Sequence, residues 1–167
     1  IQTVRFVIPK EHTISGKIYH NALLVKGGIL RSASSSARVS QNGEFSIKLS
    51  HAGSVTFRYS PTVKELGASW LKVCTVEEQT ELTLKYFDAG FTATLYGPEG
   101  EVLPHCSGHL SGASYLRFKS DKFGRIDVPN LVEGAYSWHC DELQGACVPA
   151  ATFLVEGKTD IELYLLK

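Results

Sequence analysis

The sequence contains no methionine and no long run of hydrophobic residues. No stretch approaches the roughly 20 apolar residues that a helix needs to cross a bilayer. The first ten residues, IQTVRFVIPK, also lack the layout of a secretory signal peptide. We therefore expect no membrane span in this chain. Because the chain begins at Ile1 and lacks methionine throughout, we also expect a processed product or a piece of a longer protein.

An excess of either charge is missing as well. The chain has 17 Lys and Arg residues against 17 Asp and Glu residues, so its formal net charge is zero. Proteins that hold nucleic acid through its phosphates carry a strongly cationic surface. The balance therefore argues against a nucleic-acid partner. Gly-rich phosphate loops and paired-carboxylate motifs are also missing, so the sequence gives no support to the enzymes that use them.

Helical periodicity is the third absence, because no segment keeps apolar residues at helical spacing over three turns. Alternating or β-branched runs recur instead, separated in the second half by Gly, Pro, Asn and Asp. In the first half they occupy residues 3–8, 13–19, 44–50, 54–60, 69–76 and 81–87. This pattern predicts an all-β protein.

The two halves of the chain also match each other. Residues 14–19 (ISGKIY) align with 92–97 (TATLYG), residues 40–59 align with 120–140, and residues 76–84 align with 155–163. Both copies place a glycine turn before a strand that carries aromatic residues at alternate positions. We predict two tandem antiparallel β-sandwich domains, residues 1–87 and 88–167, of Ig-like or prealbumin-like type and joined by a very short hinge.

The second copy resembles a known pattern. Its segments FTATLYGPEGEVL, SDKFGRIDVPNLVEGAYSWHC and ATFLVEGKTDIELYLL are similar to the collagen-adhesin B-type (CnaB, prealbumin-like) domains of bacterial surface proteins and pilins. Those domains have a D-x-x-G turn and an L-P-x-G-x-Y turn-strand. The first copy, with ISGKIY and SQNGEFSIKL, is similar to the related carboxypeptidase-regulatory-like sandwiches. The resemblance implies a non-enzymatic structural module.

Many members of that family carry an internal Lys–Asn isopeptide bond assisted by a buried glutamate. The resemblance places that glutamate at Cys140, and the last strand, IELYLLK, has no asparagine. In the first copy Lys17 lies in the opening strand, but Arg58 and Tyr59 occupy the glutamate region. We therefore predict no isopeptide bond in either copy. The Tyr-Arg-Gly-Ser tail of transthyretin-related hydrolases is also missing, so that enzyme class is not expected.

Four cysteines leave several pairings open. Cys106, Cys140 and Cys147 belong to the second copy, and we expect a disulfide of Cys106 with either Cys140 or Cys147. Alternation along the strand places Cys140 on the same face as Tyr136 and Trp138, so a buried thiol is the alternative. Cys74 is expected to be a small buried residue of the first core. If the protein is cytosolic, all four thiols stay reduced.

Metal binding is the rival interpretation of the second copy. Six candidate ligands lie close in sequence, although their spacing is not that of a known zinc motif: His105, Cys106, His109, His139, Cys140 and Cys147. Catalysis by the neighbouring pair in WHC is not expected, because alternation points His139 and Cys140 to opposite faces. The remaining strand-end histidines, including His12, His20 and His51, are expected to be solvated.

We therefore expect a non-enzymatic structural or adhesive module of an extracellular appendage, such as a pilus, an adhesin stalk or a phage tail component. Its expected partners are other subunits or domains of a larger assembly, with a surface glycan as a further candidate, and its expected location is the cell surface or a virion. No cofactor is expected. One alternative is a carbohydrate- or protein-binding module that uses loops at one sandwich end, which exposed aromatic residues clustered in loops 61–69 or 104–114 would support. The other is a zinc site in the second domain.

Overall fold

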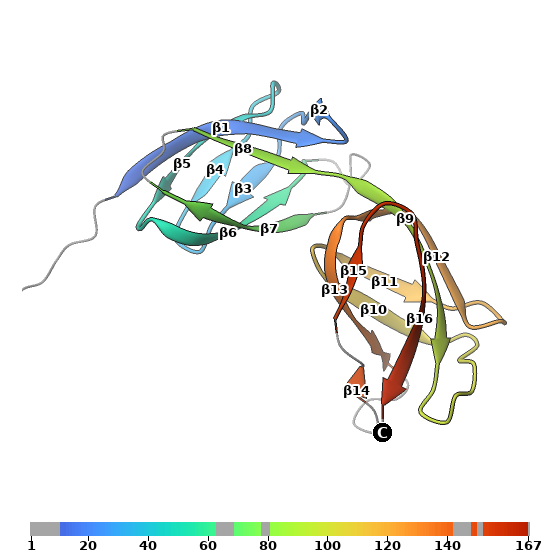
Figure 1. The fold of residues 1–167 in the computed structure, drawn as a ribbon. Coiled ribbons are helices and arrows are strands. Elements are labelled where there is room, and N and C mark those ends of the chain that lie inside the picture. The colour runs from blue at the N-terminus through green and yellow to red at the C-terminus, as the bar shows by residue number, and fades with distance from the viewer. Residues whose placement is uncertain (1–10, 63–68, 78–80, 142–147, 150–151, 167) are drawn as a thin grey trace, which may run out of the picture.

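The computed structural model describes residues 11–62, 69–77, 81–141, 148–149 and 152–166. The sixteen elements assigned within these ranges are all β-strands, which confirms the all-β fold class (Figure 1). Within the same ranges no helix has the length and apolar character that a membrane span requires.

The first half of the chain forms two four-stranded sheets that face each other. One sheet contains β1 (His12–His20), β2 (Leu23–Leu24), β5 (Glu44–Leu49) and β8 (Glu81–Tyr86). The other has the order β4 (Ser36–Arg38), β3 (Ile29–Arg31), β6 (Gly53–Ser60) and β7 (Trp70–Val76). The serine-rich run at 31–40 therefore supplies β4, a short edge strand.

The second half repeats this arrangement. One sheet has the order β12 (Arg125–Val132), β9 (Asp88–Tyr96), β16 (Thr159–Leu166) and β14 (Val148–Pro149). The other has the order β11 (Tyr115–Lys119), β10 (Ser107–Gly112), β13 (Gly134–Cys140) and β15 (Phe153–Val155). Two tandem β-sandwiches, as predicted, account for the described chain.

Strand alternation explains how each sandwich builds its core. Along β5, Phe45, Ile47 and Leu49 are buried while the residues between them are exposed. Every second side chain of a strand points to the same face, so each run presents one apolar side to the facing sheet. Trp138 is fully buried in the second core, and the predicted aromatic faces of β6 and β13 are confirmed.

A hydrogen-bonded turn of the same design starts the equivalent strand in each half. The Oγ atom of Ser40 accepts the backbone N–H groups of Asn42 and Glu44, each at 3.1 Å. In the second half Asp121 Oδ1 accepts the N–H groups of Phe123 at 2.8 Å and Arg125 at 2.9 Å. These hydrogen bonds, that of Arg125 first, hold the pKa of Asp121 below its usual value. The glycine within each turn has a φ of 71°, a conformation that favours glycine.

Two of the strand pairings are parallel, which the sequence pattern did not indicate. In the first half β1 pairs in parallel with β8, and Gly16 lies opposite Leu82. In the second half β9 pairs in parallel with β16, and Ala93 lies opposite Ile161. The first and last strands of each half therefore lie side by side in one sheet.

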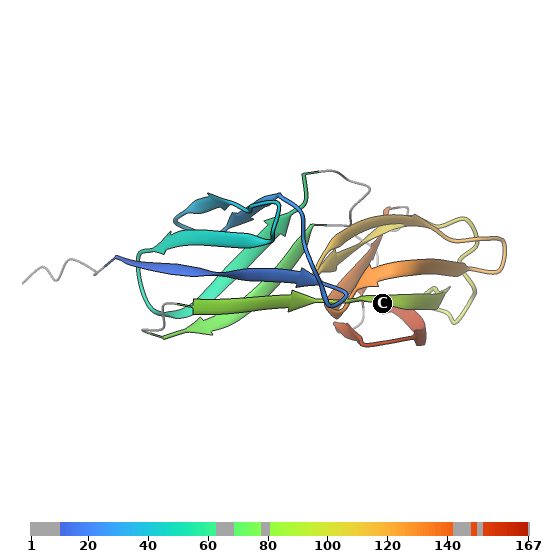
Figure 2. The ribbon, with the colours of Figure 1, turned by 90° about the horizontal axis from the view of Figure 1, so that it is seen from above.

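A single residue separates the two halves, because β8 ends at Tyr86 and β9 begins at Asp88. The chain passes almost continuously from one sandwich into the next, and the two meet at an elbow (Figure 1). Seen from above, the two sandwiches lie in one line (Figure 2).

Candidate functional site

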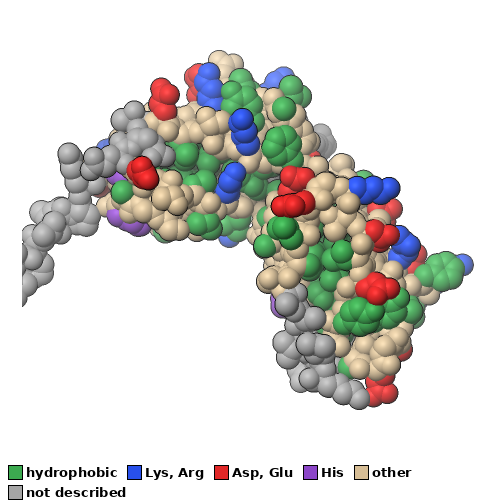
Figure 3. Space-filling view, viewed as in Figure 1, with side chains coloured by type: hydrophobic (Ala, Val, Ile, Leu, Met, Phe, Trp, Pro, Cys, Tyr) green, Lys and Arg blue, Asp and Glu red, His purple; other side chains and the backbone are tan. Residues whose placement is uncertain are grey.

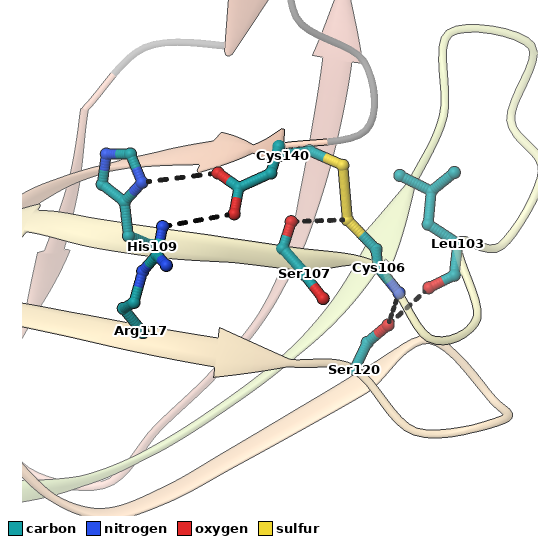
Figure 4. Close-up of a disulfide and its surroundings, with 8 residues drawn as sticks. Leu103, Cys106, Ser107, His109, Arg117, Ser120 and Cys140 are labelled. Carbon is teal, nitrogen blue, oxygen red and sulfur yellow. Dashed lines mark hydrogen bonds and ion pairs between the residues drawn. A yellow bond between two sulfur atoms is a disulfide. The ribbon is translucent and has the colours of Figure 1, made fainter.

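A disulfide joins Cys106 and Cys140 in the second sandwich (Figure 4). Cys106 directly precedes β10 and Cys140 ends β13, and these two strands are hydrogen-bonded neighbours. Their Cα atoms lie 6.5 Å apart, within the usual range for a disulfide. Both residues are buried, with exposures of 2% and 7%. This is one of the two pairings left open by the sequence, and Cys147 lies outside the described residues.

A buried serine holds the chain around Cys106. The Ser120 hydroxyl accepts the backbone N–H of Cys106 at 2.9 Å and donates to the carbonyl of Leu103 at 2.7 Å (Figure 4). The backbone N–H of Ser120 donates in turn to the carbonyl of Cys106 at 2.9 Å. A buried hydroxyl is stable only when its hydrogen bonds are made. The covalent bond and these hydrogen bonds therefore fix the same end of the sandwich.

The histidines predicted as metal candidates lie on the opposite face from this disulfide. His109 and His139 are cross-strand neighbours on β10 and β13, and their ring centroids lie 4.7 Å apart. Asp141 lies beside them, with Oδ1 3.9 Å from His109 Nδ1, and it also pairs with Arg117 at 3.5 Å. Among the described residues no three His, Cys, Asp or Glu side chains could hold a metal ion together. The sulfurs of Cys106 and Cys140 are bonded to each other on the buried face of the sheet, whereas His109 and His139 lie on its other face. His105 lies in the turn before β10.

A polar contact that the sequence did not indicate ties the end of β1 to the start of β9. His20 Nε2 lies 2.7 Å from Asp88 Oδ2, and the side chains are only 19% and 18% exposed. Asn21 accepts the backbone N–H of Asp88 at 2.9 Å and donates its amide to the Asp88 carboxylate at 3.3 Å. His20 was expected to be solvated, and that prediction is wrong. We refer to His20, Asn21 and Asp88 as the joint cluster.

Aromatic rings support the joint cluster from the first sandwich. The Tyr86 ring stacks on His20 with centroids 4.4 Å apart and on Trp70 with centroids 4.9 Å apart. Burial raises the pKa of Tyr86, and it raises the pKa of the neighbouring Tyr59 to about 12. Both phenols are therefore neutral at physiological pH. The last residue of β8 is held on both ring faces, immediately before the chain leaves the first sandwich.

Further contacts join the two sandwiches beside this cluster. The backbone N–H of Leu71 in the first sandwich donates to the carbonyl of Ala113 in the second at 2.8 Å. The backbone N–H of Glu133 donates to the carbonyl of the connecting residue, Phe87, at 2.8 Å. Val132 belongs to the second sandwich but packs within the hydrophobic core of the first. Polar and apolar contacts on several strands therefore limit rotation about the single connecting residue.

A groove of about 610 Å³ lies where the two sandwiches meet. Its walls come from β7 and the end of β8 on one side, and from β15 and the turns before β11 and β13 on the other. Hydrophobic side chains gather on the inner side of the elbow, with acidic side chains beside them (Figure 3). We call this feature the elbow groove.

The other sequence-predicted positions lie apart from the groove or on its border. Lys17 is half-exposed and pairs with Glu44 at 3.5 Å. Cys74 is partly buried against the first core, and burial raises the pKa of its thiol. For the binding-module alternative, residues 63–68 lie outside the described ranges. The other proposed loop, 104–114, contains no Phe, Tyr or Trp and mostly forms β10.

No family model and no curated protein sequence matches this chain. Solved structures with a similar arrangement include a streptococcal ancillary pilin, at 13% identity and a TM-score of 0.39, over 92% of this chain and 62% of that one. The minor pilin of Streptococcus agalactiae matches at 10% identity and a TM-score of 0.40, over 92% and 97%. The shaft pilin SpaA of Lactobacillus rhamnosus GG matches at 8% identity and a TM-score of 0.31, over 94% and 98%. This chain thus spans less than two thirds of the ancillary pilin, and likenesses at this level leave its function open.

Proposed function

We propose that the chain is a non-enzymatic structural module of a cell-surface appendage, such as a pilus or an adhesin stalk. The observation that carries this proposal is the joint between the sandwiches. The joint cluster, the backbone hydrogen bond from Leu71 to Ala113 and Val132 in the first core all lie around one connecting residue, Phe87. Sandwiches joined by a flexible linker would lack such contacts. A fixed joint is what a module needs when it transmits position or force along an appendage.

The distribution of chemistry in the molecule agrees with this role. The polar groups gathered in the described residues hold strands, turns and the joint in place. The buried thiols of the second sandwich form a disulfide, a bond that persists in oxidising environments outside the cell. We propose on these grounds a location at the cell surface, with other subunits of the same assembly as partners.

The finer family assignment is part of the same proposal. We propose that the two sandwiches are copies of one unit that resembles the collagen-adhesin B-type domain, with the boundary at residues 87 and 88. The equivalent turns at Ser40 and Asp121, and the parallel pairing of the first and last strands in both halves, support it. In the second copy the disulfide at Cys140 occupies the position where the resemblance places the glutamate of an isopeptide bond.

Immunogold electron microscopy of intact source cells tests the proposed location. Antibodies raised against this chain should decorate surface filaments or the cell exterior without permeabilisation. Labelling only after permeabilisation would refute a surface role. Labelling confined to virions would favour the phage appendage over the pilus or stalk. An antibody to a cytosolic protein, applied to the same cells, controls for lysis.

A further inference from the structure

The elbow groove contains the free edge of a β-sheet. β7 is the last strand of its sheet and pairs only with β6 in the strand order of the described residues. The backbone N–H of Leu71 points away from β6, since it donates to Ala113 of the second sandwich. Successive N–H groups of a strand point to opposite sides, so those of Val73 and Thr75 also point outward. An open edge of this kind is a template for another strand.

The side chains around this edge are apolar and exposed. Val73 is 63% exposed, Phe87 is 41% exposed and Leu154 is 55% exposed, and all three line the groove. Exposed apolar side chains that gather in one groove indicate an interaction surface more strongly than scattered ones. The backbone edge and the apolar walls together fit an extended peptide with alternating apolar residues.

The walls of the groove also differ in charge. Lys72 and Lys85 lie on the side of the first sandwich, and Glu133 and Glu156 lie on the side of the second. The Lys72 ammonium lies 3.3 Å from the carbonyl of Lys85 and 5.9 Å from the centre of the Trp70 ring, so it already has partners. The Lys85 ammonium lies 6.0 Å from the centre of the Tyr19 ring. Glu133 Oε1 accepts the backbone N–H of Gly157 at 2.8 Å. The carboxylates of Glu133 and Glu156 stay on the wall of the second sandwich, and that wall favours a peptide with a cation among its apolar residues.

One segment of this chain has that composition and lies outside the described residues. Residues 3–8, TVRFVI, alternate with Val4, Phe6 and Ile8 on one face and Arg5 on the other. Strands of this type require a neighbouring strand to satisfy their backbone groups. The segment is the right length and chemistry for the edge of β7 and for the acidic wall.

The direction of β1 argues for a groove on another copy. β1 ends in the joint cluster at His20, so its first residue, His12, lies roughly 26 Å from the joint at 3.3 Å per residue. The start of β1 therefore lies at the end of the first sandwich remote from the elbow (Figure 1), and residues 3–8 precede it in the chain. To reach its own groove the segment would have to reverse direction and run back past β8.

We propose that residues 3–8 of one copy add as a strand to the β7 edge in the elbow groove of a second copy. The contact joins the start of one molecule to the middle of the next, so it is heterologous and repeats head to tail. The partner in the proposed appendage is then a second copy of this chain, and the biological role of the pairing rests on that proposed function. The pairing itself can be tested on the purified chain, independently of its role in an appendage.

Complementation between two full-length variants tests the pairing. Phe6→Asp places a charge on the apolar face of the segment and leaves the groove intact. Val73→Pro removes the outward N–H of the groove edge and leaves the segment intact, and Pro is tolerated on edge strands. Phe123→Asp is the control. Phe123 is 64% exposed, close to the 63% of Val73, and it lies in the turn before β12, away from the elbow.

Sedimentation velocity at rising concentration should show oligomers for the unmodified chain and for Phe123→Asp, and monomers for each of the other variants. An equimolar mixture of Phe6→Asp and Val73→Pro should form dimers that do not extend, because only one functional contact exists per pair. An unmodified chain that stays monomeric to about 0.5 mM, or a mixture that stays monomeric, would overturn the proposal. Circular dichroism verifies folding, and Leu154→Lys replaces Val73→Pro if the proline variant unfolds. Surface labelling without self-association would refute this pairing and leave the proposed function standing.

Discussion

Removing the Cys106–Cys140 disulfide should destabilise the second sandwich and leave the first nearly unchanged. The bonded residues are 34 positions apart in the sequence. In the chain-entropy account, closing a loop of that length lowers the entropy of the unfolded chain by about 13 cal/mol/K, which is about 3.8 kcal/mol at 25 °C. The double variant Cys106→Ala/Cys140→Ala should therefore lose about 3 to 4 kcal/mol in the free energy of unfolding of that sandwich.

The two tryptophans of the chain allow each sandwich to be followed separately. Trp70 is 3% exposed in the first core, and Trp138 is fully buried in the second. In a Trp70→Phe background the fluorescence of Trp138 reports only the second sandwich during urea unfolding. In a Trp138→Phe background Trp70 reports only the first. Each cysteine variant is compared with the disulfide-containing protein in the same background, so the cost of the tryptophan substitution cancels.

Two results would refute this reasoning. A loss below about 1 kcal/mol in the Trp138 transition would mean that the disulfide does not restrict the unfolded chain as the loop-entropy account requires. An equal loss in both transitions would mean that the sandwiches unfold as one unit. In that case the hydrophobic contact of Val132 with the first core couples them more strongly than their separate cores suggest.

Other predictions concern the turns, the joint and the covalent state. Gly16→Ala should cost the first sandwich about 1 to 3 kcal/mol of unfolding free energy, because the added Cβ would collide with the backbone of Leu82. Gly90→Ala is the control in the second sandwich, because its added Cβ would meet no atom closer than 4.0 Å. An equal loss for the two variants in urea unfolding would contradict the packing argument. Asp88→Ala should lower the free energy of unfolding by about 2 kcal/mol, as the loss of a partly buried charged hydrogen bond does. The two sandwiches should then move independently, so that residual dipolar couplings need two alignment tensors instead of one. A single alignment tensor for this variant would refute the role of the joint cluster. The pKa of Asp121 is lowered in the folded protein, so the ionised carboxylate contributes stability above its unfolded pKa of about 3.9, and this stability is lost as the pH falls through the lower folded value. The melting temperature of the unmodified protein should therefore fall more steeply in acid than that of Asp121→Asn. Melting temperatures that fall in parallel with pH for the two proteins would contradict this prediction. Intact mass spectrometry should show no loss of about 17 Da, since no isopeptide bond is expected; such a loss would require a Lys–Asn bond.

Much of the fold could be predicted from the sequence because its signals are local. The alternation in EFSIKL at β5 places Phe45, Ile47 and Leu49 on the buried face without reference to any other strand. The turns at Gly43 and Gly124 are similarly encoded within a few residues, as is the inward direction of Cys140. The match between the halves extended these local signals to a prediction of two sandwiches.

The functional features were harder to predict because they depend on distant segments. His20 and Asp88 are separated by 68 positions, and nothing around His20 distinguishes it from a solvated strand-end histidine. The candidate ligands HCSGH and HC are close in sequence, yet β10 and β13 send the cysteines inward and His109 and His139 outward. These residues are candidate metal ligands because they are close in sequence, but the cysteines and the two histidines lie on opposite faces of the sheet.

The sequence by itself determined the strands, their buried faces and the turns between them, since each is set by side-chain alternation and by the backbone preferences of a few adjacent residues. The tertiary structure decided the rest: the parallel pairing of β1 with β8 and of β9 with β16, the choice of Cys140 as the partner of Cys106, the joint cluster and the elbow groove. These features require segments far apart in the chain to meet in one register, and alternation carries no information about strand direction or neighbours.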